Sequence, residues 1–102
     1  MIYRVKPAAA AAATLISVAQ GKEAYLTGWA CNKGVADDYI YVYALKSGES
    51  VTTDTELYNK LRIPANDTFT FTPVHLDAGE SLVVMSQNGT VVFTVTGQEV
   101  AK

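Results

Sequence analysis

The sequence predicts a single all-β domain, an antiparallel β-sandwich of about seven strands preceded by an extended N-terminal arm. Three observations support this class. The chain has 102 residues, which is enough for one hydrophobic core and too few for two. Residues that favour turns recur at the short intervals typical of all-β proteins. The segments between them are rich in β-branched and aromatic residues, and none of them has the periodicity of an amphipathic helix.

The turn residues divide the chain into segments with strand character. Turns are expected at residues 20–22, 32–34, 47–48, 64–67, 77–79 and 88–89. Strands are expected near residues 14–19, 22–31, 38–46, 56–63, 67–72, 80–87 and 90–97. This number of short strands is typical of a sandwich in an Ig-like or jelly-roll-like arrangement, which would occupy residues 14–102.

Two short segments give the most specific predictions of strand geometry. From Thr68 to Thr72 phenylalanine and threonine alternate, so both phenylalanines fall on one face of a half-buried strand. Asn88 and Gly89 form a tight-turn candidate, because this pair readily supplies the positive φ angles of a hairpin turn. We therefore expect a hairpin between the last two strands.

Residues 1–13 are expected to form an extended arm. The six alanines in this segment are too short a run to hold a helix alone, since isolated helices need about 12–15 residues. Arg4 and Lys6 would be available for contacts with a neighbouring subunit. A cleaved secretory signal peptide over residues 1–19 is the alternative, because two cations precede an apolar stretch that ends in small residues. The strand character of residues 14–19 favours the arm.

A row of tyrosines is the most informative feature for function. Strand alternation places Ile40, Val42 and Ala44 on one face, and Tyr39, Tyr41 and Tyr43 on the other. The aliphatic row fits the core. The tyrosines fit a subunit contact, where a ring has one dry and one wet end, or a layer covered within the monomer, or a sugar-binding platform.

Within the strand expected at residues 22–31, the part from Ala24 to Cys31 is apolar on both faces. This is typical of a central strand, so Trp29 is expected in the core and Cys31 as a small buried hydrophobic residue. His75 is the single histidine, and nothing in the sequence brings it next to Cys31 to form a catalytic pair.

The sequence predicts a protein that is not an enzyme and that holds no cofactor or metal. It contains no phosphate-binding, dinucleotide-binding or nucleophile-elbow motif. The acidic residues Asp37, Asp38, Asp54 and Glu56 lack the spacing of a calcium loop. The net charge of −2, without clustered cations, argues against a nucleic-acid partner. No apolar run approaches the roughly 18 residues of a membrane span, so no membrane partner is expected either.

Several short segments occur in a familiar order. They are the Gly21-Lys22 turn, a strand ending at Asn32, Ile63-Pro64-Ala65 before a strand, Leu76-Asp77-Ala78-Gly79-Glu80 before another, and Gly97-Gln98-Glu99 near the end. In this order and spacing they resemble the small β-sandwich virion proteins of tailed bacteriophages. The resemblance covers about four-fifths of the chain.

The resemblance implies a non-enzymatic structural protein located in the virion. A capsid decoration (cement) protein is the main expectation, with the major capsid protein or other virion proteins as partners and a homo-oligomer, preferably a trimer, as its assembly. The interface candidates are Tyr39, Tyr41, Tyr43, Arg4 and Lys6. A neck, tail, baseplate or fibre-attachment protein is the nearest alternative. From another class, the alternative is a secreted carbohydrate-binding module that uses Trp29 or the tyrosines.

Overall fold

The computed structural model describes residues 1–101 and contains two antiparallel β-sheets, as the sequence predicts. The strands are β1 (Ile2–Val5), β2 (Ala13–Ser17), β3 (Lys22–Asn32), β4 (Asp38–Leu45), β5 (Glu56–Ile63), β6 (Thr68–Thr70), β7 (Val74–Leu76), β8 (Ser81–Ser86) and β9 (Val91–Ala101). One 3-10 turn, η1 (Thr53–Thr55), precedes β5. Within residues 1–101, no helix has the length and apolar character needed to cross a membrane.

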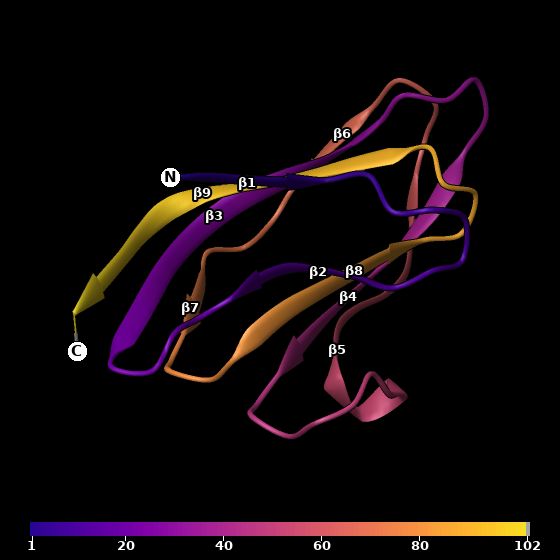
Figure 1. Cartoon of the computed structure of the whole chain (residues 1–102). Helices are drawn as coiled ribbons and strands as arrows, with labels where there is room; N and C mark the ends of the chain where they lie inside the picture. The colour runs from indigo at the N-terminus through magenta and orange to yellow at the C-terminus, as the bar shows by residue number, and fades with distance from the viewer. Residues whose placement is uncertain (102) are drawn as a thin grey trace.

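The strands form two layers (Figure 1). Sheet A has the order β1-β9-β3-β6, with β7 pairing to the first half of β3. Sheet B has the order β2-β8-β4-β5. The chain changes layer repeatedly, so most of the pairings join segments far apart in the sequence.

Strand alternation builds the core between the sheets. In β3 every second residue from Ala24 to Asn32 points inward and is buried or is a glycine. In β9 the same is true of Val91, Phe93 and Val95, and in β4 of Ile40 and Val42, which are at most 1% exposed. The predicted aliphatic row of β4 therefore lies in the core, where apolar burial stabilises the fold by about 25 cal/mol per Å².

The turn at Asn88 and Gly89 does not form the expected hairpin. β8 belongs to sheet B and β9 to sheet A, so this turn connects the two layers. Only Gly89 has a positive φ, at 74°, whereas a type I′ hairpin turn needs two such residues. The backbone N–H of Asn88 donates to the carboxylate of Asp38 instead, which ties the turn to the start of β4.

The N-terminal segment lies differently from an arm that leaves the domain. Residues 2–5 form β1, which pairs antiparallel with Thr96 to Phe93 of the same chain. Tyr3 and Val5 point inward and are half-buried against the core. The four residues of β1 have no strong strand pattern of their own, and they form a strand because they pair with the open edge of β9. The sequence of residues 2–5 alone does not reveal this pairing.

Candidate functional site

The outer face of sheet A carries the exposed aromatic residues of the molecule. Seven of its outward-facing side chains from β1, β3 and β9 form a continuous set that we call the Trp29 face: Ile2, Arg4, Tyr25, Thr27, Trp29, Thr94 and Thr96. The exposed fractions of Ile2, Tyr25 and Trp29 are 65%, 54% and 36%. A sheet surface with large exposed apolar side chains suits a broad contact with another protein.

The register of sheet A arranges this face in rows across the strands. Arg4, Thr94 and Trp29 are opposite one another in successive strands. The guanidinium Nε of Arg4 donates to Oγ1 of Thr94 at 3.3 Å, and Thr94 is buried between its two larger neighbours. The next row contains Ile2, Thr96 and Thr27. The threonines are short, so the larger side chains beside them stand above the sheet.

One end of the Trp29 face carries a small polar cluster. The hydroxyl of Tyr25 donates to the carboxylate of Glu23, and Nε2 of His75 lies 3.5 Å from the same carboxylate oxygen. The rings of Tyr25 and His75 have centroids 4.7 Å apart. The hydrogen bond to Glu23, together with its negative charge, raises the pKa of Tyr25 above its ordinary value.

The outer face of sheet B carries the tyrosine row. Its apolar members from β4 and β8 are Tyr39, Tyr41, Tyr43, Leu45, Val83 and Met85, which we call the tyrosine face. Tyr43, Leu45 and Val83 are buried, and Tyr41 and Met85 pack beside them. The tyrosines point away from the core as expected, and yet Tyr43 is only 6% exposed.

Charged residues flank the tyrosine face at both ends. The Nζ atom of Lys60 lies 5.6 Å from the ring centroid of Tyr39, and Arg62 pairs with Asp37 at 2.7 Å. At the other end, Glu56 is opposite Tyr43, and one of its carboxylate oxygens is buried without a hydrogen-bond partner within residues 1–101. Burial, with a smaller contribution from Glu56, raises the pKa of Tyr43 above its ordinary value.

The predicted interface residues are therefore divided between two opposite faces. Arg4 belongs to the Trp29 face, Lys6 is exposed just after β1, and the three tyrosines lie on sheet B. The expectation that Trp29 lies in the core is wrong. Leu26 and Ala30 fill the inward positions of β3, which leaves Trp29 on the outer surface.

Ile2 and Tyr25 are the surface residues that the sequence reasoning missed. Thr27, a polar residue between Tyr25 and Trp29 on the same strand face, is the signal that could have identified this face as open to water.

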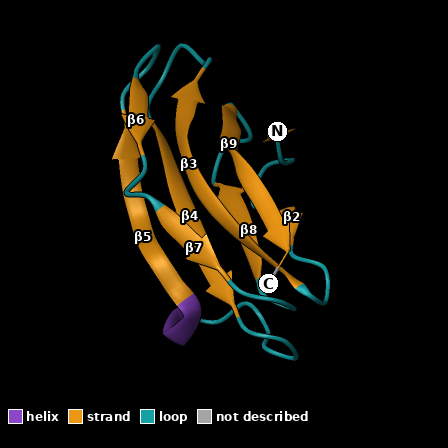
Figure 2. Ribbon diagram, turned by 90° about the vertical axis from the view of Figure 1, so that its left-hand side faces the viewer, coloured by secondary structure: helices purple, strands orange, loops and turns teal. Residues whose placement is uncertain are grey.

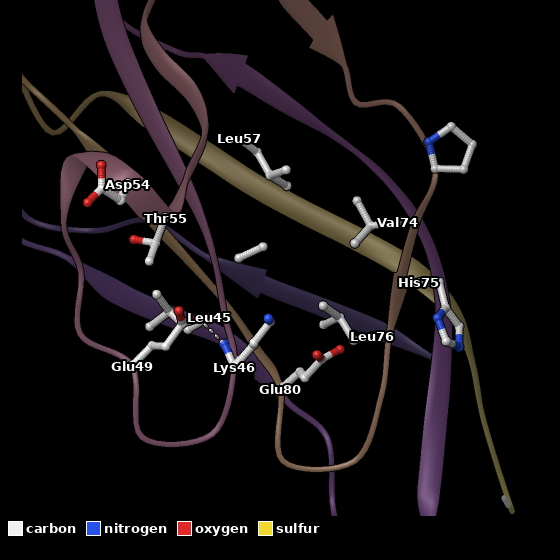
Figure 3. Close-up of a pocket in the computed structure, with 12 residues that line it drawn as sticks. Leu45, Lys46, Glu49, Asp54, Thr55, Leu57, Val74, His75, Leu76 and Glu80 are labelled. Atoms are coloured by element: carbon white, nitrogen blue, oxygen red, sulfur yellow. Dashed lines mark hydrogen bonds between the residues drawn. The ribbon is translucent and has the colours of Figure 1, made fainter.

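A groove at the side of the sandwich is lined by residues of β5 and β7. These two strands belong to different sheets and come near each other without pairing (Figure 2). The groove has a volume of about 530 Å³. Leu57, Val74 and Leu76 form its apolar part, and acidic Glu49 and Glu80 lie at its lower rim (Figure 3). The backbone N–H of Lys46 donates to Glu49 at 2.6 Å, and that of Asp77 to Glu80 at 2.6 Å. Both carboxylates thus brace the loops around the groove.

A buried polar cluster joins the two sheets at the opposite end. The carboxylate of Asp38 accepts hydrogen bonds from the backbone of Tyr39, Asn88 and Thr90 and from the hydroxyl of Thr90, at 2.7–3.2 Å. The amide of Asn32 donates to the carbonyls of Ala36 and Ile63. Burial acts to raise the pKa of Asp38, but these hydrogen bonds outweigh it and lower the pKa. These hydrogen bonds hold the start of β4 in sheet B to the turn before β9 in sheet A, so the cluster is a structural joint between the two sheets.

Cys31 and His75 lie far apart on the outer face of sheet A. Cys31 is opposite Thr68, and His75 is opposite Tyr25, six residues earlier in β3. At about 3.3 Å per residue this places them about 20 Å apart. Within the described residues, no three histidine, cysteine or acidic side chains gather in an arrangement that could hold a metal ion.

Comparison of the chain with protein families, with characterised proteins and with solved structures finds no match.

Proposed function

We propose that this protein is a non-enzymatic structural protein of a bacteriophage virion, of the capsid decoration type, with an Ig-like or jelly-roll-like sandwich. It binds as a homo-oligomer, with a trimer as the expected order, and contacts the major capsid protein or another virion protein. The observation that carries the proposal is the exposure of Ile2, Tyr25 and Trp29 on one outer sheet face. The order of turn and strand motifs in the sequence supports the virion class.

The chemistry of the Trp29 face supports a protein contact. Aromatic residues and arginine are enriched in protein interfaces, and Arg4 lies in the same row as Trp29. The face contains few charges, so covering it costs little desolvation of charged groups. Weak contacts of this kind become effective when many copies bind one particle, because each bound copy raises the local concentration for the next contact.

The test compares two substitutions on the same face of β3. Trp29→Ala removes the exposed ring, and Thr27→Ala removes a small exposed polar group two residues away. We expect the Trp29 variant to lose self-association in sedimentation equilibrium and binding to bacteriophage heads prepared without the protein. The Thr27 variant should keep both. A chain that remains monomeric at all concentrations and binds no heads contradicts the proposal.

A gold-labelled antibody against the protein would locate it in electron micrographs of complete particles. Labelling at the neck, tail or baseplate would assign the protein as an accessory protein of that structure.

A carbohydrate-binding module is the second candidate, and the exposure of Trp29 and Tyr25 favours it. Aromatic rings on a sheet surface offer stacking platforms for sugar rings, and Thr27 and Thr96 add hydroxyls between them. The intrinsic fluorescence of Trp29, the single tryptophan, reports directly on such binding. A blank glycan array with unchanged fluorescence on adding oligosaccharides removes this candidate.

A further inference from the structure

β1 is held to the domain by one edge and few buried contacts. It pairs with β9 over four residues, and its other edge has no partner within the described chain. Its side chains alternate between exposed and half-buried, and none is fully buried. Releasing β1 from β9 therefore exposes little apolar surface compared with releasing any strand of the core.

The connection between β1 and β2 is strained. It covers residues 6–12 and contains no glycine. Ala10 nevertheless adopts a φ of 56°, in the left-handed region that alanine avoids because its Cβ then crowds the following carbonyl oxygen. Its backbone N–H donates to the carbonyl of Ser86 at 2.9 Å, and that of Ala11 to the carbonyl of Ala8 at 3.1 Å. These bonds hold a compact loop that crosses from sheet A to sheet B.

The connection is also longer than the crossing requires. Seven residues span up to about 23 Å when extended, whereas packed sheets lie about 10 Å apart. Straightening the loop would release the left-handed conformation of Ala10 and carry β1 clear of its own sheet. A short strand on a strained connection is a condition under which protein chains exchange an element between copies.

We propose that β1 exchanges between copies of this chain, so that β1 of one copy pairs with β9 of the next in the same register and a trimer closes as a ring of three such links. The occupant of the β9 edge is then a second copy of residues 2–5. Each exchanged pair keeps the β1–β9 hydrogen bonds, and loop strain is relieved in every copy. This proposal rests on the homo-oligomeric assembly inferred above and gives it a specific link.

Exchange also makes the Trp29 face a composite surface. Ile2 and Arg4 are part of that face, opposite Thr96 and Thr94 of β9. In the exchanged form these two side chains come from the partner copy. A partner that binds the whole Trp29 face therefore contacts two copies of the chain at once, and binds the exchanged oligomer.

The register supplies a direct test. The N-terminal amine of Met1 donates to the carbonyl of Gly97, and the N–H of Gly97 donates to the carbonyl of Met1. The next pair, Ile2 and Thr96, is therefore a non-hydrogen-bonded pair, in which Cα atoms lie about 4.5 Å apart. This separation suits a disulfide.

The experiment uses two single-cysteine chains, Ile2→Cys and Thr96→Cys, each also carrying Cys31→Ser and each with a different mass tag. They are mixed at high concentration under reducing conditions, diluted, and then oxidised. Exchange predicts a disulfide-linked heterodimer that joins positions 2 and 96, seen by non-reducing electrophoresis and peptide mass spectrometry. The proposal is overturned if this product does not exceed the collision level.

A matched mixture sets the collision level. Thr27→Cys replaces Ile2→Cys, because Thr27 is opposite the same Thr96, is also exposed, and lies in a central strand that cannot leave the sheet. Its heterodimer with Thr96→Cys can form only by random encounter.

A second pair of variants tests the strain. Ala10→Gly removes the conformational cost of the compact loop, and Ala11→Gly adds equal flexibility at a position without a positive φ. We expect Ala10→Gly to lower the cross-linked fraction by about tenfold per connection relative to Ala11→Gly. Equal fractions would overturn the role of Ala10. Oligomers that depend on Trp29 but give no cross-link would keep the proposed function and reject the exchange.

Discussion

The two outer faces of the sandwich carry similar aromatic residues and differ in how much water reaches them. On the tyrosine face the cross-strand partners are bulky and apolar: Tyr41 is opposite Met85, and Tyr43 is opposite Val83. On the Trp29 face the partner of Trp29 is Thr94, a short polar residue. For these three rings, a bulky apolar neighbour on the next strand accompanies a covered ring, and a short polar neighbour accompanies an exposed one. Tyr25 lies opposite His75 and Gln98 and is exposed, so the polarity of the neighbour matters as well as its size.

This difference assigns separate tasks to the two faces. The tyrosine face is a second, smaller apolar layer that stabilises sheet B from outside. The Trp29 face leaves its apolar surface exposed, and for this reason we propose it as the contact surface. Aromatic residues at outward positions are thus compatible with either stability or binding, and their cross-strand partners distinguish the two.

The largest expected effect concerns the joint on which both faces depend. Asp38→Asn replaces a carboxylate that accepts four hydrogen bonds, and its amide nitrogen would face donors. We expect a loss of about 3 kcal/mol in the free energy of unfolding, measured by urea denaturation. Asp37→Asn is the control, because its exposed ion pair with Arg62 should contribute less than about 1 kcal/mol.

Acid should act on the same joint. The folded pKa of Asp38 is lower than its unfolded value of 3.8, so its stabilising contribution is complete above that pH. The contribution is lost as the pH falls through the lowered pKa. Denaturation at a series of pH values should show this loss in the natural chain and a flatter profile in Asp38→Asn. Parallel profiles would show that Asp38 is not the titrating group.

The comparison of faces is tested most directly by the same substitution on each. Tyr43→Ala should destabilise the fold by about 2–3 kcal/mol, since it removes a buried ring from the tyrosine face. Tyr25→Ala should cost only about 0.5 kcal/mol, since that ring is more than half exposed. Thermal and urea unfolding measure both. Similar losses for the two variants would break the distinction.

The smallest effect is a difference in how two tyrosines ionise. The pKa values of Tyr25 and Tyr43 are both raised above 10.0, the first mainly by its hydrogen bond to Glu23 and the second mainly by burial. Glu23→Gln should therefore return Tyr25 towards its ordinary pKa, whereas Glu56→Gln should leave most of the Tyr43 shift. The chain has six tyrosines, so the signal of one residue is obtained as a difference. Spectrophotometric titration of each variant, minus the titration of the same variant that also carries Tyr25→Phe or Tyr43→Phe, provides the measurement.

The sign of the linked stability effect follows from the raised pKa of Tyr43. The folded state holds its proton more tightly, so the contribution is present at lower pH and is lost as the pH rises from 10.0 through the raised pKa. Tyr43→Phe should remove this alkaline dependence while keeping the ring. An unchanged alkaline profile would point to another group.

Local alternation predicted the β-sandwich architecture and the inward row of β4, because these depend on the chain's own side-chain period. It did not predict β1 or the exposure of Trp29. A four-residue strand depends on an edge that lies about ninety positions away, as the pairing of Tyr3 with Val95 shows. Whether an outward ring is covered depends on the strand beside it, and that neighbour is fixed by topology.

The turn at Asn88 and Gly89 shows the same limit. Its residues fit a hairpin locally, but the carboxylate of Asp38, fifty residues earlier, fixes the backbone of Asn88 and directs the chain into the other sheet. A long-range acceptor therefore overrode a local turn preference.

The central position of β9 in sheet A has a consequence for biosynthesis. β9 leaves the ribosome after every other described strand, yet it separates β1 from β3. Until β9 has been synthesised, β1 and β3 lack the strand that pairs with both of them. Sheet A is therefore completed late in synthesis. On a polysome, neighbouring nascent chains would then lie close together while β1 of each is still unpaired. This is the stage at which β1 exchanges most easily between them.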